Sequence, residues 1–129
     1  MLVRVIYVSE LVGRTAQSAL SMAQIVGVSD TNNRRDDICS AMLFHGGQVV
    51  QVIEGQRADV DRLLRRLEAD PRLGDLRLIA DQPIAARELT EAVSICHDPQ
   101  QTLTQVGLND LDDVTLGSVE AMLDYRLAA

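Results

Sequence analysis

A short segment around two adjacent glycines, residues 45–55, constrains the fold of this chain more than any other stretch. Its sequence is HGGQVVQVIEG, and Gly46-Gly47 separates the apolar run before it from the β-branched run after it. Two glycines between two such runs are typical of a β-hairpin, because a two-residue hairpin turn needs positive φ angles that glycine adopts easily. A hairpin with this turn pairs Met42 with Gln51.

Gln51 is the unusual residue of this hairpin. Side chains alternate along a strand, so Gln51 shares one face with Val49 and Ile53. A primary amide buried on an apolar face costs about 1–3 kcal/mol if it has no hydrogen-bond partner. By the same alternation, Tyr7 projects from an apolar face of the strand expected at residues 2–8. A tyrosine hydroxyl and a glutamine amide satisfy each other when buried, so a contact between Tyr7 and Gln51 is expected.

The order of the predicted elements indicates an α+β fold. Strands are expected where β-branched residues cluster, and helices where apolar residues recur at intervals of three and four. The resulting order is strand, helix, strand, strand, helix, strand, strand, which is the ferredoxin-like βαββαββ arrangement with two helices on one face of a mixed sheet. The expected strands are residues 2–8, 38–44, 48–53, 76–80 and 90–96, the helices begin at Thr15 and Val60, and residues 29–37 form a polar turn.

The length of 129 residues suits one compact domain with a continuation at its C-terminal end. Residues 1–98 contain all the expected strands of the sheet. Residues 99–129 show two short helical patterns, at 101–106 and 114–127, each with an apolar side. We expect this helical extension to pack on the same domain and to cover the second face of the sheet.

Composition and charge exclude several classes of partner. The net charge is -7, which argues against binding to nucleic acid or to an anionic membrane surface. No apolar run approaches the ~18 residues of a membrane span, and the N-terminus does not have the pattern of a signal peptide. Cys39 and Cys96 lie in apolar runs without metal-ligand spacing and are expected to be small buried hydrophobes. A cytoplasmic location is therefore expected.

Several motifs, taken together and in order, resemble the BLUF family, the sensors of blue light using FAD. The similarity covers roughly residues 1–98, and no single motif is specific to the family. The matching pieces are Arg4-Val-Ile-Tyr-Val-Ser9, Asn32-Asn33, Gln51-Val-Ile-Glu-Gly55, Arg66, Asp70-Pro-Arg72 and Gln82-Pro-Ile-Ala-Ala-Arg87.

The resemblance implies a non-covalently bound flavin, FAD or another flavin such as FMN, held between the two helices and the sheet. Tyr7 and Gln51 match the photoactive pair, in which the glutamine contacts both the tyrosine and the flavin edge. The other cofactor-binding residues implied are Asn32, Asn33, Arg66 and Asp70. A domain of this family turns over no substrate, so the chain is expected to be a receptor rather than an enzyme. Its signal would pass to an unknown downstream protein.

Two segments depart from the usual family sequence. The family commonly has Ile-Thr-Gly at the start of the hairpin, where this chain has Ile38-Cys39-Ser40. In the expected register Ser40 lies on the same face as Gln51, where the family has no side chain. In the last strand the family commonly has Trp-Ser-Met, where this chain has Ala92-Val93-Ser94. These departures bear on whether the pocket is open and on how the signal leaves it.

Alternatives to the receptor therefore stay open at the level of sequence. The chain could be a degenerate BLUF-like module that binds no flavin and serves in interaction or dimerisation. An unrelated enzyme of ferredoxin-like fold is a weaker alternative, since the sequence supplies no nucleophile–base pair or metal cluster. Tyr7 and Gln51 could be ordinary sheet residues, and Arg66 with Asp70 a solvated i,i+4 pair. A homodimer or higher oligomer is expected if part of the sheet stays exposed.

Overall fold

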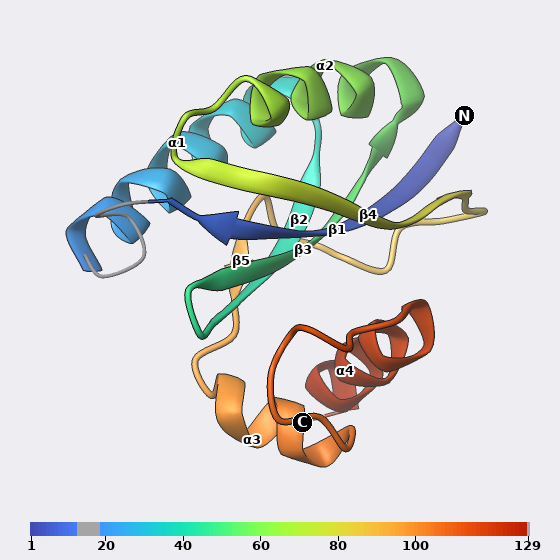
Figure 1. Cartoon of the computed structure of the whole chain (residues 1–129). Coiled ribbons are helices and arrows are strands. Elements are labelled where there is room, and N and C mark those ends of the chain that lie inside the picture. The colour runs from blue at the N-terminus through green and yellow to red at the C-terminus, as the bar shows by residue number, and fades with distance from the viewer. Residues whose placement is uncertain (13–18, 129) are drawn as a thin grey trace.

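In the described part of the chain, residues 1–12 and 19–128, five strands form one sheet with helices on both faces (Figure 1). The structure is a computed structural model. The sheet order is β4-β1-β3-β2-β5. The strands are β1 (Leu2–Leu11), β2 (Cys39–His45), β3 (Gln48–Gln56), β4 (Leu73–Pro83) and β5 (Ser94–Ile95), and the helices are α1 (Ala19–Asp36), α2 (Arg57–Glu68), α3 (Pro99–Gln105) and α4 (Leu116–Ala128). The predicted α+β, ferredoxin-like class is confirmed.

The strand directions are those of a split βαβ unit. β3 lies between β1 and β2 and is antiparallel to both, and β4 is antiparallel to β1 on the other side. β5 is parallel to β2 at the far edge. The sheet is therefore mixed, and its central strand β3 carries Gln51.

The Gly46-Gly47 turn sets the register of the sheet. Gly46 has φ 59° and Gly47 has φ 75°, the positive angles of a two-residue hairpin turn. This turn places Met42 opposite Gln51, as predicted, and the pairing of β1 with β3 places Tyr7 opposite Gln51 on the other side. Three neighbouring strands thus contribute one side chain each to the same spot.

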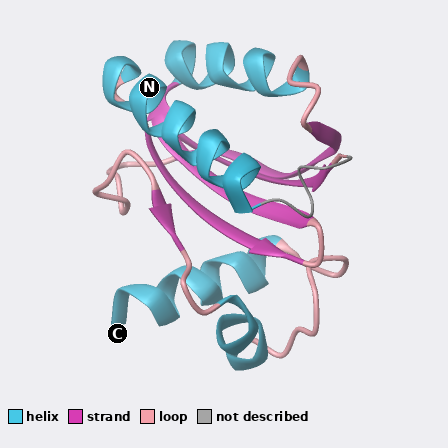
Figure 2. Ribbon diagram, turned by 90° about the vertical axis from the view of Figure 1, so that its left-hand side faces the viewer, coloured by secondary structure: helices cyan, strands magenta, loops and turns pink. Residues whose placement is uncertain are grey.

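The two helices of the βαββαββ unit pack on one face of the sheet. α2 buries Val60 and Leu63 against Val3, Val5 and Tyr7 of β1. Figure 2, which looks across the sheet, shows α1 and α2 together on one side of it. This face is where the resemblance places the flavin.

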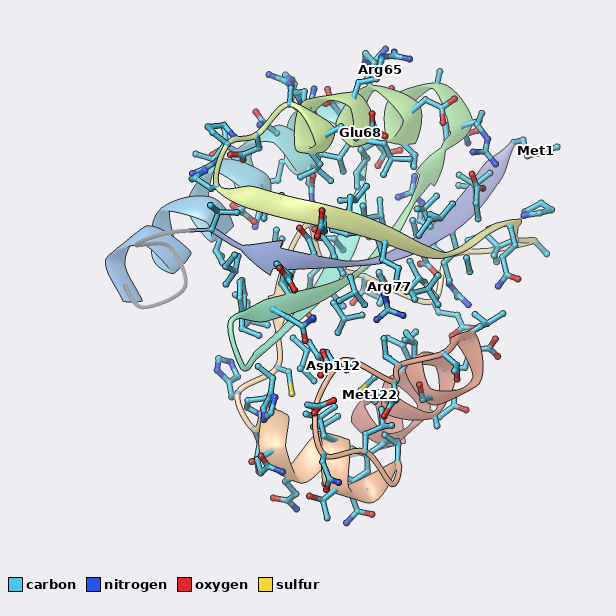
Figure 3. The ribbon with its side chains drawn as sticks, in the orientation of Figure 1. Met1, Arg65, Glu68, Arg77, Asp112 and Met122 are labelled. Atoms are coloured by element: carbon cyan, nitrogen blue, oxygen red, sulfur yellow. The ribbon has the colours of Figure 1, made fainter. Side chains whose placement is uncertain are left out.

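The C-terminal helices cover the second face, as predicted. Figures 1 and 2 show α3 and α4 on the side opposite α1 and α2. One apolar core joins them to the sheet, and its fully or nearly fully buried members include Ile6, Val8, Leu43, Val52, Leu103, Leu111, Val119 and Met122. The connection between the helices is also tied to β4: Arg77 Nη2 donates to the carbonyls of Leu111 at 3.1 Å and Asp112 at 3.3 Å (Figure 3).

A buried ion pair fixes the connection between β4 and β5. Glu54 of β3 is fully buried, and its Oε2 accepts Arg4 Nε at 2.9 Å and Arg4 Nη2 at 2.6 Å. Its other oxygen, Oε1, accepts the backbone N–H groups of Glu88 at 2.9 Å and Leu89 at 2.8 Å. Because the carboxylate is paired on both oxygens, its burial holds residues 88–89 against the sheet.

Two predicted elements differ from the structure. The polar turn predicted at residues 29–37 is wrong, because α1 continues to Asp36 and only Asp37 leaves the helix, with φ 55°. An i,i+4 pair, Arg34 Nε to Asp30 Oδ2 at 3.0 Å, stabilises this polar end of the helix. The strand predicted at 90–96 is reduced to β5. The predicted helix start at Thr15 lies outside the described residues.

No helix within residues 1–12 and 19–128 combines the length and the apolar composition needed to cross a bilayer.

Candidate functional site

A cavity of about 460 Å³ opens between the helical face of the sheet and the helices α1 and α2. Its apolar walls come from the sheet, from α2 and from the start of β4, and they include Leu11, Met42, Phe44, Val49, Leu63, Leu67 and Leu73. Its polar lining comes from the sheet, from α1 and α2 and from the turn after α2, and it includes Tyr7, Ser29, Asn32, Gln51, Arg66, Asp70 and Arg72. Apolar walls with a few convergent polar groups are typical of a site for a small organic ligand.

Tyr7 and Gln51 form the base of this cavity. They lie directly opposite each other on β1 and β3, with 1% and 3% of their surfaces exposed. The Tyr7 hydroxyl donates a hydrogen bond to Gln51 Oε1, so the expected contact is present. Burial, together with the negative charge of Asp70, raises the pKa of Tyr7 well above its ordinary value. Tyr7 is therefore a neutral phenol, and its proton is directed at Gln51.

Charged residues from α2 and the following turn line another part of the cavity. Asp70 accepts Arg72 Nη2 at 2.7 Å, and this hydrogen bond is the main reason that the pKa of Asp70 lies below its ordinary value. Arg66 Nη2 donates to Asp36 Oδ2 at 3.2 Å. Its Nε atom is buried and has no hydrogen-bond partner among the described residues. An unpaired buried N–H that lies beside a cavity is a donor that a ligand could satisfy.

Of the six residues predicted for the site, the structure brings five to the cavity and places one elsewhere. Tyr7, Asn32, Gln51, Arg66 and Asp70 all line the cavity. Asn33 does not. Its side chain is 1% exposed, and its Nδ2 donates to the Ala92 carbonyl at 2.8 Å and to Ser40 Oγ at 3.1 Å.

Ser40 does not fill the cavity, although it departs from the family sequence. It lies on the expected face of β2, fully buried, but it is not among the cavity-lining residues. Its hydroxyl donates to the Ala92 carbonyl at 3.0 Å and accepts the Asn33 amide. The side chain thus occupies a polar junction between α1, β2 and the segment before β5.

The segment with the second departure also reaches the cavity wall. Val93 packs in a small apolar cluster with the buried residues Leu11, Met42 and Val49, all three of which line the cavity. Ser94 and Ile95, which form β5, then pair with Ala41 and Met42 of β2.

Sequence reasoning missed the contribution of the C-terminal half of α1. Val28 and Ser29 line the cavity, but a polar turn was expected to begin at residue 29. The one signal for a longer helix is the i,i+4 spacing of Asp30 and Arg34. Arg72 of the Asp70-Pro-Arg72 motif also lines the cavity, where its Nη2 donates to Asp70 Oδ2.

Comparisons with known proteins agree with this geometry. The family model described as sensors of blue-light using FAD (BLUF) matches residues 2–93. The structure of BlrB, a BLUF protein in its dark state, is 27% identical and superposes with a TM-score of 0.81 over 98% of this chain and 96% of that one. BlsA in its photo-activated state shares the fold, at 17% identity and a TM-score of 0.87 over 100% and 96% of the two chains.

A larger protein contains a similar unit. A bacterial light-regulated adenylyl cyclase is 28% identical with a TM-score of 0.70, and the match covers 74% of this chain but only 28% of the cyclase. No curated protein matches the chain by sequence.

Proposed function

Because the chain belongs to the BLUF family, the sensors of blue light using FAD, we propose that it is a blue-light receptor whose flavin binds beside Tyr7 and Gln51. The observation that carries this proposal is the buried hydrogen bond between these two side chains at the base of the cavity. A tyrosine donor and a glutamine acceptor, both with almost no exposed surface, form a switchable pair next to a ligand site.

The residues around the cavity fit a flavin ring. A volume of about 460 Å³ falls within the ~300–1,000 Å³ of small-molecule sites, and its walls are mainly aliphatic. A flavin has a flat apolar body and one edge of carbonyl and ring-nitrogen groups, which needs hydrogen-bond donors. Gln51, Asn32 and the unpaired Arg66 Nε supply such donors from three different elements. We propose that these residues, with Asp70, hold the ring.

The residues of the chain would act as follows. A bound flavin supplies the group that absorbs blue light. Tyr7 holds its proton at the Gln51 carbonyl oxygen, because its raised pKa keeps the phenol neutral. Since Oε1 of Gln51 is engaged by Tyr7, its amide nitrogen is left to donate to the ligand. We propose that light rearranges the hydrogen bonds of Tyr7 and Gln51, and that this change is the signal.

The flavin is proposed as FAD or FMN, and the output as an interaction with a downstream protein rather than a reaction of this chain. Self-association through an exposed part of the sheet is a further part of the proposal. A cytoplasmic location is proposed because Cys39 and Cys96 are both free thiols, the usual state in a reducing compartment. The adenylyl cyclase activity named for one similar structure is a property of that protein.

Absorption spectroscopy of the purified protein tests the proposal directly. We expect a yellow protein whose flavin band shifts to the red under blue light and recovers in the dark. Chromatography of the released cofactor then identifies FAD or FMN. Tyr7→Phe and Gln51→Ala should abolish the shift while the flavin stays bound.

The control is Tyr125→Phe. Tyr125 lies on α4, on the opposite face of the sheet, where its hydroxyl accepts Gln101 Nε2 at 3.2 Å, so this variant should keep the full shift. A colourless protein that takes up neither FAD nor FMN would reject the receptor and favour the flavin-free interaction module. A normal shift in Tyr7→Phe would reject the role given to Tyr7.

A further inference from the structure

The carbonyl of Ala92, just before β5, accepts hydrogen bonds from three donors. Two of them come from Ser40: its backbone N at 3.1 Å and its Oγ at 3.0 Å. The third is Asn33 Nδ2 at 2.8 Å. A carbonyl oxygen has two lone pairs, so three donors use its full capacity to accept hydrogen bonds. These contacts fix the backbone at Ala92.

Ser40 and Asn33 also bind each other, which closes the junction. The second hydrogen of Asn33 Nδ2 points at Ser40 Oγ, 3.1 Å away. Turning the carboxamide over would place Oδ1 against the Ala92 carbonyl oxygen, so the orientation of Asn33 is fixed by its partners. Oδ1 is buried and has no hydrogen-bond partner among the described residues, so the two hydrogen bonds that Nδ2 donates determine the orientation of the carboxamide.

This junction touches the cavity from two directions. On α1, Asn33 adjoins Asn32, which lines the cavity. On β2, Ser40 is two residues from Met42, which also lines the cavity and pairs with Gln51. Beyond Ala92, Val93 packs against the cavity-lining cluster that contains Met42.

The hydroxyl of Ser40 is the group that makes this junction possible. With alanine or glycine at position 40, one N–H of the buried Asn33 amide would have no partner, and the Ala92 carbonyl would lose its hydroxyl donor. The hydrogen bond from Asn33 to the Ala92 carbonyl would remain, but without the hydroxyl of β2 that binds both groups.

We propose that Ser40 is a positioning residue that couples the cavity end of α1 to the Ala92–Ile95 segment, so that this segment reports the state of the cavity. The proposal rests on the proposed function for the light signal itself. It assigns the output of this chain to a side chain at the position where the family sequence commonly has glycine.

Hydrogen exchange of the flavin-loaded protein, in the dark and under blue light, tests the coupling. In the wild type we expect light to change the exchange rates of the amides at residues 92–95. In Ser40→Ala these amides should exchange about fivefold faster or more in the dark, since part of the junction is lost. The light-dependent change should fall to less than half, while the red shift of the flavin band persists.

Ser9→Ala is the matched control. Ser9 is also a fully buried serine on a strand, and its hydroxyl donates to a backbone carbonyl, that of Gly74, at 2.6 Å. This variant should leave exchange at 92–95 and its response to light as in the wild type. A light-dependent change in Ser40→Ala as large as that of the wild type would overturn the proposal, as would a wild type without any change at 92–95.

A double-mutant cycle in the flavin-free protein tests the junction independently of light. Each variant changes the unfolding equilibrium constant by a certain factor. If Asn33 and Ser40 act together, the factor for the double variant, Asn33→Ala with Ser40→Ala, should differ by about threefold or more from the product of the factors for the two single variants. Independent changes would overturn the proposal. If no flavin binds at all, the proposed function falls, and this cycle alone decides whether the junction exists.

Discussion

At the scale of single residues, burial determines the chemistry of Tyr7. The phenol has 1% of its surface exposed, beside a hydrogen-bond acceptor and within the field of the Asp70 carboxylate. Burial, which is the larger cause, and the charge of Asp70 both oppose a negative charge on the ring, and both therefore raise the pKa of Tyr7 above its ordinary value of about 10. The Tyr7 proton that forms the hydrogen bond to Gln51 thus makes the free energy of unfolding depend on pH in the alkaline range.

Stability at alkaline pH should show this effect. The unfolded chain releases the Tyr7 proton near pH 10, whereas the folded chain retains it, so the stabilisation is fully present below pH 10 and is lost as pH rises above it. The difference in unfolding free energy between wild type and Tyr7→Phe should fall by about 1.4 kcal/mol per pH unit above pH 10. Urea unfolding at pH 8 and pH 11 measures it, and the comparison with Tyr7→Phe cancels the contributions of all groups that the two proteins share. A difference that is constant with pH would show that Tyr7 titrates normally.

At the scale of elements, the segment between β4 and β5 has almost no regular structure, yet it is held in place by buried polar groups. Glu54 fixes its middle part through the backbone N–H groups of Glu88 and Leu89. The Ser40 backbone N–H fixes its last part, at 3.3 Å from the Glu91 carbonyl and 3.1 Å from that of Ala92. Hydrogen bonds to side-chain and backbone groups of β2 and β3 therefore hold the part of this segment from Glu88 to Ala92 in place.

Glu54→Gln should unfold this arrangement at a large loss of stability. The substitution keeps the shape of the side chain but removes the buried carboxylate of the pair and leaves Arg4 only the exposed Glu88 carboxylate at 3.5 Å. Losing one partner of a buried pair typically destabilises by about 3–5 kcal/mol. Denaturant unfolding measures the loss. Asp81→Asn is the matched control, because the Arg57–Asp81 pair is partly exposed and should contribute less than about 1 kcal/mol. Equal effects of the two substitutions would contradict the role given to burial.

At the scale of the whole molecule, helices cover both faces of the sheet. A strand of a second copy of the chain could therefore pair with the sheet only at one of its edges. β4 is first in the sheet order, and its outer edge meets no other strand of residues 1–12 and 19–128. Leu78, at the middle of β4, is 56% exposed. A long edge strand with an exposed leucine is a surface on which a second strand can pair.

Light scattering over a range of concentrations tests self-association through this edge. We expect a dimer at high protein concentration and a monomer for Leu78→Arg, because a charge at the centre of the strand opposes pairing. The exposed Val28 on α1 provides the control: Val28→Arg should leave the dimer intact. A wild type that is monomeric at all concentrations would exclude the proposed homo-oligomer.

The sequence predicted those features that depend on local pattern. The Gly-Gly turn fixes the hairpin register, and strand alternation then brings Tyr7 and Gln51 together. The prediction from sequence was wrong where contacts between distant parts of the chain determine the secondary structure. The polar residues 29–36 continue a helix, because buried Asn33 gains partners on β2 and before β5 that no local pattern encodes. The division of the chain into a domain at residues 1–98 and a C-terminal extension of the same domain at 99–129 stays a prediction.

The two anchors of the β4–β5 connection have a mechanical consequence. Glu54 holds residues 88–89, and Ser40 holds residues 91–92, so Thr90 is the one residue between them. A displacement of β5 that keeps both anchors in place is therefore confined to the backbone after Ala92, and a larger one has to break the hydrogen bonds of Ser40. Ser40 therefore limits how far the edge strand can move while residues 88–89 stay bound to Glu54.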